Sequence, residues 1–398
     1  MKGQKGDTRI ALLAPLPGPY YIAAWNELNR LTGENLAVRF LSLSNTRRHW
    51  RVPVEEMRFD WAALAKGSQR PLLKWLLDQC RAGAAMLAFL VRWQPKAVIC
   101  GGYDSLAAWT AFLWCKLFQR RLALCLDSHA SDARPRSRLR LYLKQVFVSR
   151  CDSVAVLGNA ARAYAIQLGA KESGIVRAPY GGDTALFARE AEKVDATAEK
   201  RLRGWPAKLI LYSGRLAPEK GIFALLEAFK RVSETLLDAG LLLVGDGPLR
   251  RDAERYCQEN SLDRAFFCGP QPYERMPYFY ALADVLVLPS LSEPYGYVVI
   301  EAFACGVPAI VSRIAGAAAD LIVEGQTGYC ITPGDAEELA LKIAIVLQDG
   351  ELRKRMSENC RPKAREFGPQ ECAAGLLAAA GKPGFSGSRP TSAPRLAH

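Results

Sequence analysis

The chain has 398 residues, of which 50% are hydrophobic and 23% are charged, and its formal net charge is +13. This length predicts about two domains, and this composition excludes an intrinsically disordered chain. Residues 1–190 carry the excess charge, with 28 Lys and Arg against 14 Asp and Glu. The asymmetry points to a polyanionic partner or a membrane surface for the first half, unless these cations are simply solvated on surface helices.

The cysteines and apolar runs bear on where the chain works. Its 11 cysteines include no Cys-x-x-Cys pair, and several lie in apolar runs: Cys100, Cys125, Cys268 and Cys330. This pattern argues against a disulfide framework or a zinc site and favours a cytoplasmic location. Residues 1–9 lack the apolar core of a signal peptide, and charged residues interrupt the apolar stretch 71–93. We therefore expect any contact with the inner face of the cell membrane to be peripheral.

The first half alternates short apolar runs with longer helical patterns. Its runs predict strands at 9–14, 36–43, 97–100, 122–126, 153–157 and 174–178. Helical patterns fall between them, as at 21–31 and 106–117. Such alternation predicts a parallel sheet with helices on both faces.

The second half repeats this plan, with strands predicted at 208–212, 241–244, 265–268, 284–288, 309–312 and 329–332. We therefore predict an α/β protein with two Rossmann-like, doubly wound parallel-sheet domains that face a cleft. The predicted limits are an N-terminal domain at 1–182, a linker at 183–206, a C-terminal domain at 207–380 and a disordered tail at 381–398.

The predicted strand-to-helix turn at 213–221 carries two cations. Gly214 allows the turn, and Pro218 suits the first turn of a helix. Arg215 and Lys220 then lie beside a helix N-terminus, whose free N–H groups favour anions. This arrangement suits a diphosphate, although a surface loop with two solvated cations is the alternative.

A second turn carries two carboxylates with seven residues between them. Glu293 lies in the loop after a strand, and Glu301 lies about one turn into the next helix. A carboxylate accepts hydrogen bonds from two hydroxyls at once, which suits the vicinal diols of sugars and ribose. Backbone amides near Gly296 and Tyr297 could add contacts to a sugar or phosphate. A buried structural glutamate is the alternative for Glu301, because apolar residues surround it.

Three weaker signals lie at other strand ends. Gly245, in the turn 244–248, would let a ligand approach the backbone, although a plain turn is equally compatible. His129 follows a strand of the first half and either faces the cleft or has a structural role. Gly18, in the Pro-rich turn 14–20, either contacts phosphate or acceptor or belongs to a rigid turn.

One segment of the first half interleaves basic and apolar residues. Its cations are Arg134, Arg136, Arg138, Arg140, Lys144 and Arg150. Such a segment could dock on anionic lipid or hold a lipid-diphosphate acceptor, or it could be a solvated helix face. No nucleic-acid-binding motif accompanies it, so we expect no nucleic-acid partner.

The motifs of the second half together resemble glycosyltransferase family 4, the retaining GT-B glycosyltransferases. They are Gly-Arg-Leu-Ala-Pro-Glu-Lys-Gly at 214–221, Val-Gly-Asp-Gly-Pro at 244–248, Pro-Ser-Leu-Ser-Glu-Pro-Tyr-Gly at 289–296, Ile-Glu-Ala-Phe-Ala-Cys-Gly-Val-Pro at 300–308 and Gly-Gln-Thr-Gly-Tyr at 325–329. The resemblance implies a GT-B fold, with an acceptor-binding first domain and a nucleotide-sugar-binding second domain.

The resemblance also implies roles for single residues. Arg215 and Lys220 are similar to the pair that stabilises the donor diphosphate. Glu293 is similar to the carboxylate that holds the transferred sugar, and Glu301 to the one that holds the ribose. The amides of Gly296 and Tyr297 would assist them, and Gln271 lies in a loop similar to the base-contacting segment. In the first domain, His129 is similar to the histidine near the reaction centre, and Gly18 to the loop near the phosphates.

The sequence departs from the family at two places. Gly18 stands between Pro17 and Pro19 where paired glycines are common, and the stretch 315–320 lacks the usual paired glycines and glutamate. The resemblance implies transfer with retention of anomeric configuration, in which the departing phosphate takes the acceptor proton. It implies no cofactor and no metal, and the chain has no Asp-x-Asp triplet.

The expected donor is a nucleotide-sugar, with UDP- and GDP-sugars as the leading candidates. The expected acceptor is a glycan or a lipid-linked acceptor of surface polysaccharide or glycoconjugate synthesis. Two alternatives remain at this point. One is an inactive GT-B binding or scaffold protein, and the other is a nucleotide-sugar hydrolase or epimerase of the same fold.

Overall fold

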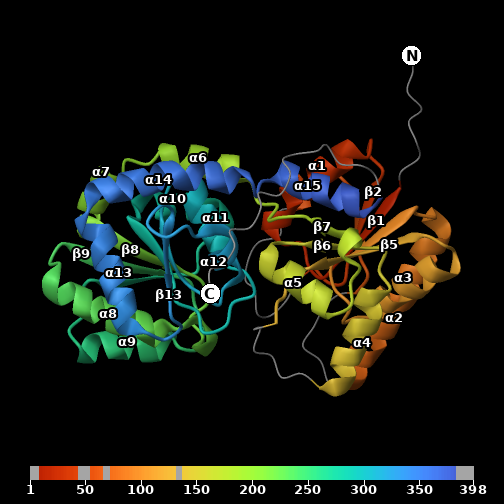
Figure 1. Ribbon diagram of the computed structural model, residues 1–398, viewed down its shortest axis with the longest axis horizontal. Coiled ribbons are helices and arrows are strands. Elements are labelled where there is room, and N and C mark those ends of the chain that lie inside the picture. Colours follow the sequence, from red (N-terminus) through yellow and green to blue (C-terminus); the bar gives the residue numbers. More distant parts are fainter. Residues whose placement is uncertain (1–8, 44–53, 66–71, 131–136, 382–398) are drawn as a thin grey trace, which may run out of the picture.

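The computed structural model describes residues 9–43, 54–65, 72–130 and 137–381. Two parallel sheets lie side by side, each covered by helices (Figure 1). The seven-stranded sheet is built from the first half of the chain and the six-stranded sheet from the second half. This architecture confirms the predicted α/β class with two doubly wound parallel sheets. Arg134 and Arg136 of the basic segment lie outside the described residues.

The first sheet has the spatial order β3-β2-β1-β4-β5-β6-β7. Its strands are β1 (Ile10–Ala14), β2 (Leu36–Phe40), β3 (Asp60–Ala63), β4 (Ala97–Cys100), β5 (Arg121–Leu126), β6 (Ser153–Val156) and β7 (Ile175–Arg177). Six of them coincide with predicted strands. Five of these six are short apolar runs that are mostly buried in the sheet, and the sixth, β7, is a partly exposed edge strand. The other edge strand, β3, is mostly exposed, and its sequence Asp-Trp-Ala-Ala contains no β-branched residue.

Helices cover the two faces of this sheet separately. On one face lie α2 (Leu72–Trp93), α3 (Leu106–Leu117), α4 (Arg138–Ser149) and α5 (Asn159–Gln167), which share one apolar core. Ser105 and Ser137 cap α3 and α4 by accepting hydrogen bonds from backbone N–H groups of the first turn. The other face is covered by α1 (Pro19–Leu31). Among the described residues, no helix combines the length and the hydropathy needed to cross a membrane.

The second sheet has the order β10-β9-β8-β11-β12-β13. Its strands are β8 (Lys208–Ser213), β9 (Ala239–Val244), β10 (Ala265–Gly269), β11 (Val285–Leu288), β12 (Ala309–Ser312) and β13 (Gly328–Ile331). The helices α8 (Ile222–Thr235), α9 (Arg250–Glu259) and α13 (Ala336–Gln348) pack on one face. The other face carries α10 (Met276–Leu282), α11 (Tyr297–Ala304) and α12 (Gly316–Leu321), with α14 (Gly350–Arg365) against α11.

Two segments connect the domains more closely than a loop would. Two helices, α6 (Thr184–Glu192) and α7 (Ala196–Leu202), occupy the segment expected as a linker and pack on α10. The last helix, α15 (Pro369–Ala379), falls within the expected second domain but packs against α1 of the first (Figure 1). Ser153 and Arg121 both donate to the carbonyl oxygen of Ala379. The chain therefore crosses between the two sheets twice.

Two helical glycines, one closely packed and one exposed, test whether α15 packs on the first domain. A Cβ at Gly375 in α15 would overlap the carbonyl oxygen of Arg177, whereas a Cβ at Gly350 meets nothing within 4 Å. Replacing glycine by alanine favours a helix by about 1 kcal/mol. We nevertheless expect Gly375→Ala to destabilise the protein by about 1–3 kcal/mol through overpacking, and Gly350→Ala not to destabilise it. Thermal unfolding followed by circular dichroism measures both, and a higher Tm for Gly375→Ala would contradict the packing of α15.

Candidate active site

The carboxyl ends of the strands in both sheets meet between the domains. The imidazole of His129, three residues beyond β5, donates from Nε2 to the carbonyl oxygen of Glu293 at 2.8 Å. The hydroxyls of Tyr21 in α1 and Tyr297 in α11 lie 2.8 Å apart. These contacts bring loops of the first domain onto the loop after β11, which is where doubly wound proteins bind their ligands.

Two glycine turns line the second-domain side of this junction. Gly214 follows β8 with a φ of 157°, and Gly245 follows β9 with a φ of 136°. A Cβ at Gly245 would overlap the carbonyl oxygen of Gly214. The turns therefore touch backbone to backbone, which requires glycine at position 245.

The two predicted cations pair with different carboxylates. The ammonium of Lys220 donates to Oε2 of Glu293 at 2.6 Å, and their side chains are only 20% and 11% exposed. Arg215 is about half exposed and pairs with Glu219 at 3.5 Å. The backbone oxygen of Glu219 also accepts from the amides of the 290–293 loop, at Leu291 and Ser292. The cationic turn and the loop of Glu293 are thus fixed to each other.

The histidine is held from its own domain as well. His129 is 5% exposed. Its neighbour Ser128 accepts a hydrogen bond from the ammonium of Lys144, a buried residue of α4, at 3.1 Å. The same ammonium lies over the rings of Tyr103 and Tyr164. The loop that carries His129 is therefore anchored to α4.

Glu301 is a buried carboxylate with two phenol partners. Tyr180 donates to Oε1 at 2.9 Å, and Tyr280 donates to Oε2 at 2.7 Å. Burial raises the pKa of Glu301, and the two phenol hydrogen bonds oppose this rise. Burial, reinforced by the charge of Glu301, raises the pKa of both tyrosines. The structure therefore keeps the carboxylate of Glu301 beneath the surface of the junction, apart from the pair of Lys220 and Glu293.

Tyrosines fill the junction around Glu301, and the sequence analysis gives their side chains no role, since it uses Tyr297 only for its backbone amide. The ring of Tyr297 lies 4.7 Å from that of Tyr180, 5.4 Å from that of Tyr20 and 5.9 Å from that of Tyr295. The hydroxyls of Tyr180 and Tyr273 lie 3.2 Å apart. One signal could have found this cluster: Tyr20, Tyr180, Tyr273 and Tyr295 each follow a proline in the sequence.

The remaining candidates lie around this centre. Gly296 starts α11 with a φ of 104°, a conformation that favours glycine. Gly18 starts α1, and a Cβ there would crowd the ring of Tyr20. Gln271 donates to the carbonyl oxygen of Cys268 at 2.7 Å and lines a pocket of about 460 Å³ beside β10, together with Arg203. Within the described part of the chain, no group of three or more His, Cys, Asp or Glu could hold a metal ion.

Residues 195–363 match the model of a family described as glycosyl transferases group 1. The second half of the chain therefore carries a domain of this family. Sulfoquinovosyl transferase from Arabidopsis thaliana is 35% identical over 176 residues, which are 42% of this chain and 33% of that protein. D-inositol 3-phosphate glycosyltransferase from Corynebacterium efficiens is 30% identical over 257 residues, 62% of this chain and 60% of that protein. The chain thus spans less than two thirds of the length of both relatives.

Solved structures match over both domains. The crystal structure of HepE from Anabaena in complex with UDP has a TM-score of 0.75 and 18% identity, covering 93% of this chain and 99% of that one. Sucrose-phosphate synthase from Thermosynechococcus elongatus has a TM-score of 0.74 and 23% identity, covering 93% and 98%. These matches confirm the predicted GT-B fold.

The buried carboxyl of Glu301 predicts a specific pH dependence of stability. Its pKa in the folded chain lies above the ordinary value of 4.5, so the folded state keeps a proton that the unfolded chain has released. This contribution to stability is complete below pH 4.5 and is lost as the pH rises through the folded pKa. Relative to Glu301→Gln, the wild type should therefore lose up to about 1.4 kcal/mol of unfolding free energy per pH unit in that window.

Urea unfolding of both proteins across this pH range measures the difference. Glu358→Gln, which removes an exposed carboxylate of α14, is the matched control. A difference between wild type and Glu301→Gln that stays constant with pH would contradict the raised pKa.

Proposed function

We propose that the chain is a retaining glycosyltransferase that moves a sugar from a nucleotide-sugar onto an acceptor hydroxyl. The observation that carries this proposal is the assembly of Lys220, Glu293 and His129 at the junction of the domains, with Arg215 in the same turn as Lys220. These residues provide cations for a leaving diphosphate and a carboxylate for sugar hydroxyls. The family match supports the same reading, because all the second-domain motifs lie within the matched residues 195–363.

We propose that the donor is a UDP-sugar, with a GDP-sugar as the second candidate. The support is a likeness of fold to HepE, whose crystal structures contain UDP and UDP-glucose. The diphosphate would contact Arg215 and Lys220 and lie beside the glycine turns at Gly214 and Gly245. Gln271 would lie on the side of the base.

The transfer step needs no protein nucleophile. The bond between the anomeric carbon and the diphosphate oxygen breaks, and a bond to the acceptor oxygen forms on the same face of the sugar. The acceptor proton passes to an oxygen of the departing phosphate. Arg215 and Lys220 stabilise the negative charge that develops there, while Glu293 positions the sugar hydroxyls. Lys220 would share its protons between Glu293 and the diphosphate, and His129 would hold the carbonyl group of Glu293 in place.

The ribose position follows from the partners of Glu301. A ribose diol that reaches this carboxylate would take the place of the Tyr180 hydroxyl on Oε1. The amides of Gly296 and Tyr297 would face the sugar or phosphate at the start of α11, where backbone N–H groups have no partner within the helix. Gly18 would reach the phosphates through the loop that ends at Tyr20.

We propose a glycan or lipid-linked sugar as acceptor, in surface polysaccharide or glycoconjugate synthesis at the cytoplasmic face of a membrane. The basic first half of the chain supports an acceptor environment that is anionic. A hydrolase or epimerase would consume the donor without transferring its sugar to an added acceptor. A scaffold protein would leave the donor unchanged.

Donor binding gives the first prediction. A ligand that binds only the folded chain raises Tm, so a UDP-sugar at about 100 times its Kd should stabilise the protein by about 2.7 kcal/mol. A thermal-shift panel with UDP-, GDP-, ADP- and dTDP-sugars measures this effect. No shift with any of the four would argue against the donor site.

Lys220 gives the second prediction. Lys220→Met removes a cation that faces the leaving group, so kcat should fall by about 10²- to 10³-fold. Lys354→Met, at an exposed position of α14, should leave kcat unchanged. Steady-state release of the nucleoside diphosphate measures kcat of both variants. A Lys220→Met enzyme with the wild-type kcat would contradict the role of Lys220 at the leaving group.

A further inference from the structure

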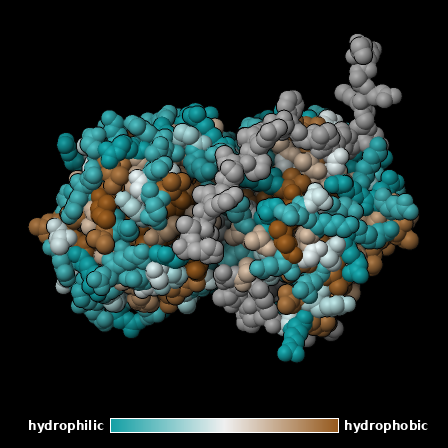
Figure 2. Space-filling view, in the orientation of Figure 1, coloured by the Kyte–Doolittle hydropathy of each residue, from teal (hydrophilic) through white to brown (hydrophobic). Residues whose placement is uncertain are grey.

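Large hydrophobic side chains are exposed on one layer of the first domain. Of the twenty such residues in the described part of the chain, eleven lie on α2, α3 and α4. The exposed fractions reach 64% at Leu113 and 76% at Leu117 in α3, and 66% at Leu139 and 62% at Tyr142 in α4. In Figure 2, hydrophobic surface appears at the right edge of the molecule, where Figure 1 places α3. The outward face of these three helices, here called the α2–α4 face, is therefore unusually apolar.

Cations accompany this apolar surface. The helices α2, α3 and α4 contain seven Lys or Arg and a single acidic residue, Asp78. In α2, the exposed Arg81 and Arg92 flank the exposed alanines and aliphatic residues between them. In α4, Arg138 and Arg140 alternate with Leu139 and are exposed. This combination is typical of helices that lie in the interface of an anionic bilayer, where apolar side chains enter the acyl boundary and cations meet phosphate.

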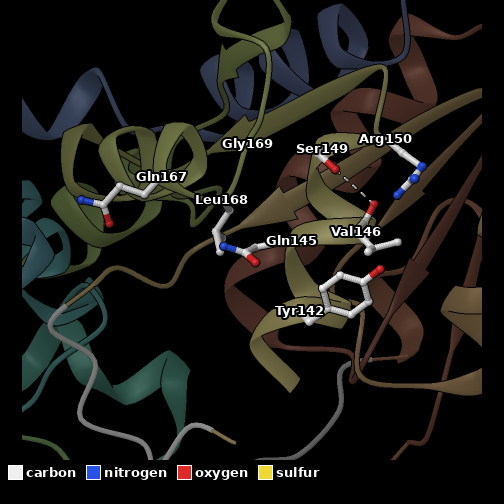
Figure 3. A pocket seen from close by; sticks show the side chains of 8 residues that line it. All are labelled: Tyr142, Gln145, Val146, Ser149, Arg150, Gln167, Leu168 and Gly169. Carbon is white, nitrogen blue, oxygen red and sulfur yellow. Dashed lines mark hydrogen bonds between the residues drawn. The ribbon is translucent and has the colours of Figure 1, made fainter. Parts of the chain in front are cut away.

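A pocket with both polar and apolar lining residues adjoins this surface. It has a volume of about 390 Å³ and lies between α4 and the end of α5. Figure 3 shows Tyr142 and Gln145 of α4 and Arg150, the residue after this helix, among the residues that line it. The guanidinium of an arginine suits a phosphate group. The pocket thus adds a place for a lipid headgroup at the edge of the apolar face.

The same face is connected to the candidate active site. The helix α4 begins nine residues after His129, and Lys144 of α4 donates to Ser128, the neighbour of His129. The α2–α4 face is therefore linked, through Lys144, to the loop whose His129 contacts Glu293. This continuity favours a partner that delivers an acceptor to the junction.

We propose that the α2–α4 face docks the protein on an anionic phospholipid membrane. The orientation toward a lipid-linked acceptor rests on the proposed function, but the docking itself does not. A second copy of the chain fits less well, because two faces that each carry six exposed cations and a single carboxylate would repel one another. Anionic lipid instead neutralises these cations and covers the apolar side chains in one contact.

Binding of the full chain to vesicles tests the docking. Vesicles of phosphatidylcholine alone are compared with vesicles that contain about one third phosphatidylglycerol. We expect strong binding only to the anionic vesicles, weakened by salt. The double variant Arg138→Gln/Arg140→Gln should bind about 25-fold more weakly, since each cation near the membrane contributes about fivefold. Leu113→Ser/Leu117→Ser should bind at least about tenfold more weakly.

Matched variants in the second domain serve as controls. Leu237 and Leu341 are 77% and 59% exposed, and Arg251 and Arg355 are exposed as well. Leu237→Ser/Leu341→Ser and Arg251→Gln/Arg355→Gln should bind anionic vesicles like the wild type.

Three outcomes would overturn the docking proposal. They are equal binding to both kinds of vesicle, wild-type binding by the α2–α4 variants, and a stable dimer in solution that Leu113→Ser/Leu117→Ser dissociates. The thermal shift with a UDP-sugar is measured on every variant. A retained shift shows that the variant is folded, whereas vesicle binding by a wild type that shows no shift would refute the donor proposal and leave the docking intact.

Discussion

The contacts of Glu293 join the two domains at the point where the strands of both sheets end. Its carboxylate accepts from Lys220 at 2.6 Å, and its backbone oxygen accepts from His129 at 2.8 Å. The ion pair is mostly buried, so loss of either partner would leave a charge without compensation. Glu219, next to Lys220, adds two backbone hydrogen bonds to the same loop. The positions of the cationic turn, the carboxylate loop and the histidine are therefore interdependent.

The fold could be predicted from the sequence wherever burial leaves a pattern in the chain. Strands such as β4 and β9 are apolar along their whole length because both faces of the sheet are covered. The edge strand β3 is mostly exposed and leaves no such pattern. The helix α15 shows its apolar side in the sequence, but nothing in that pattern tells which sheet it covers. Its position against α1 and β7 is set by tertiary packing, in which Gly375 allows a close approach to Arg177 at the end of β7.

In the candidate site, too, some residues could be placed from the sequence and others could not. Residues that lie within one motif, such as Arg215 and Lys220 or Glu293 and Gly296, could be placed because a single turn positions them. The partners of Glu301 could not, since Tyr180 and Tyr280 come from segments 121 and 21 residues away. A diol-binding carboxylate and a buried structural one have the same local sequence. The structure shows that Glu301 is buried and hydrogen-bonded to phenols, and only a ligand that competes with Tyr180 reconciles this with a role in binding.

The charge of the chain has two separate physical origins. Residues 191–398 contain 25 Lys and Arg against 26 Asp and Glu, so the second domain is close to neutral although it carries Arg215 and Lys220. Its attraction for a diphosphate is therefore local and depends on the turn that holds these two cations beside a helix N-terminus. The first half has an excess of 14 positive charges, and six of these come from α2, α3 and α4, next to exposed apolar side chains. A distributed charge acts on an extended anionic surface, whereas a fixed pair selects one ligand group. Because Lys144 ties α4 to the loop of His129, the two kinds of recognition converge on the same junction.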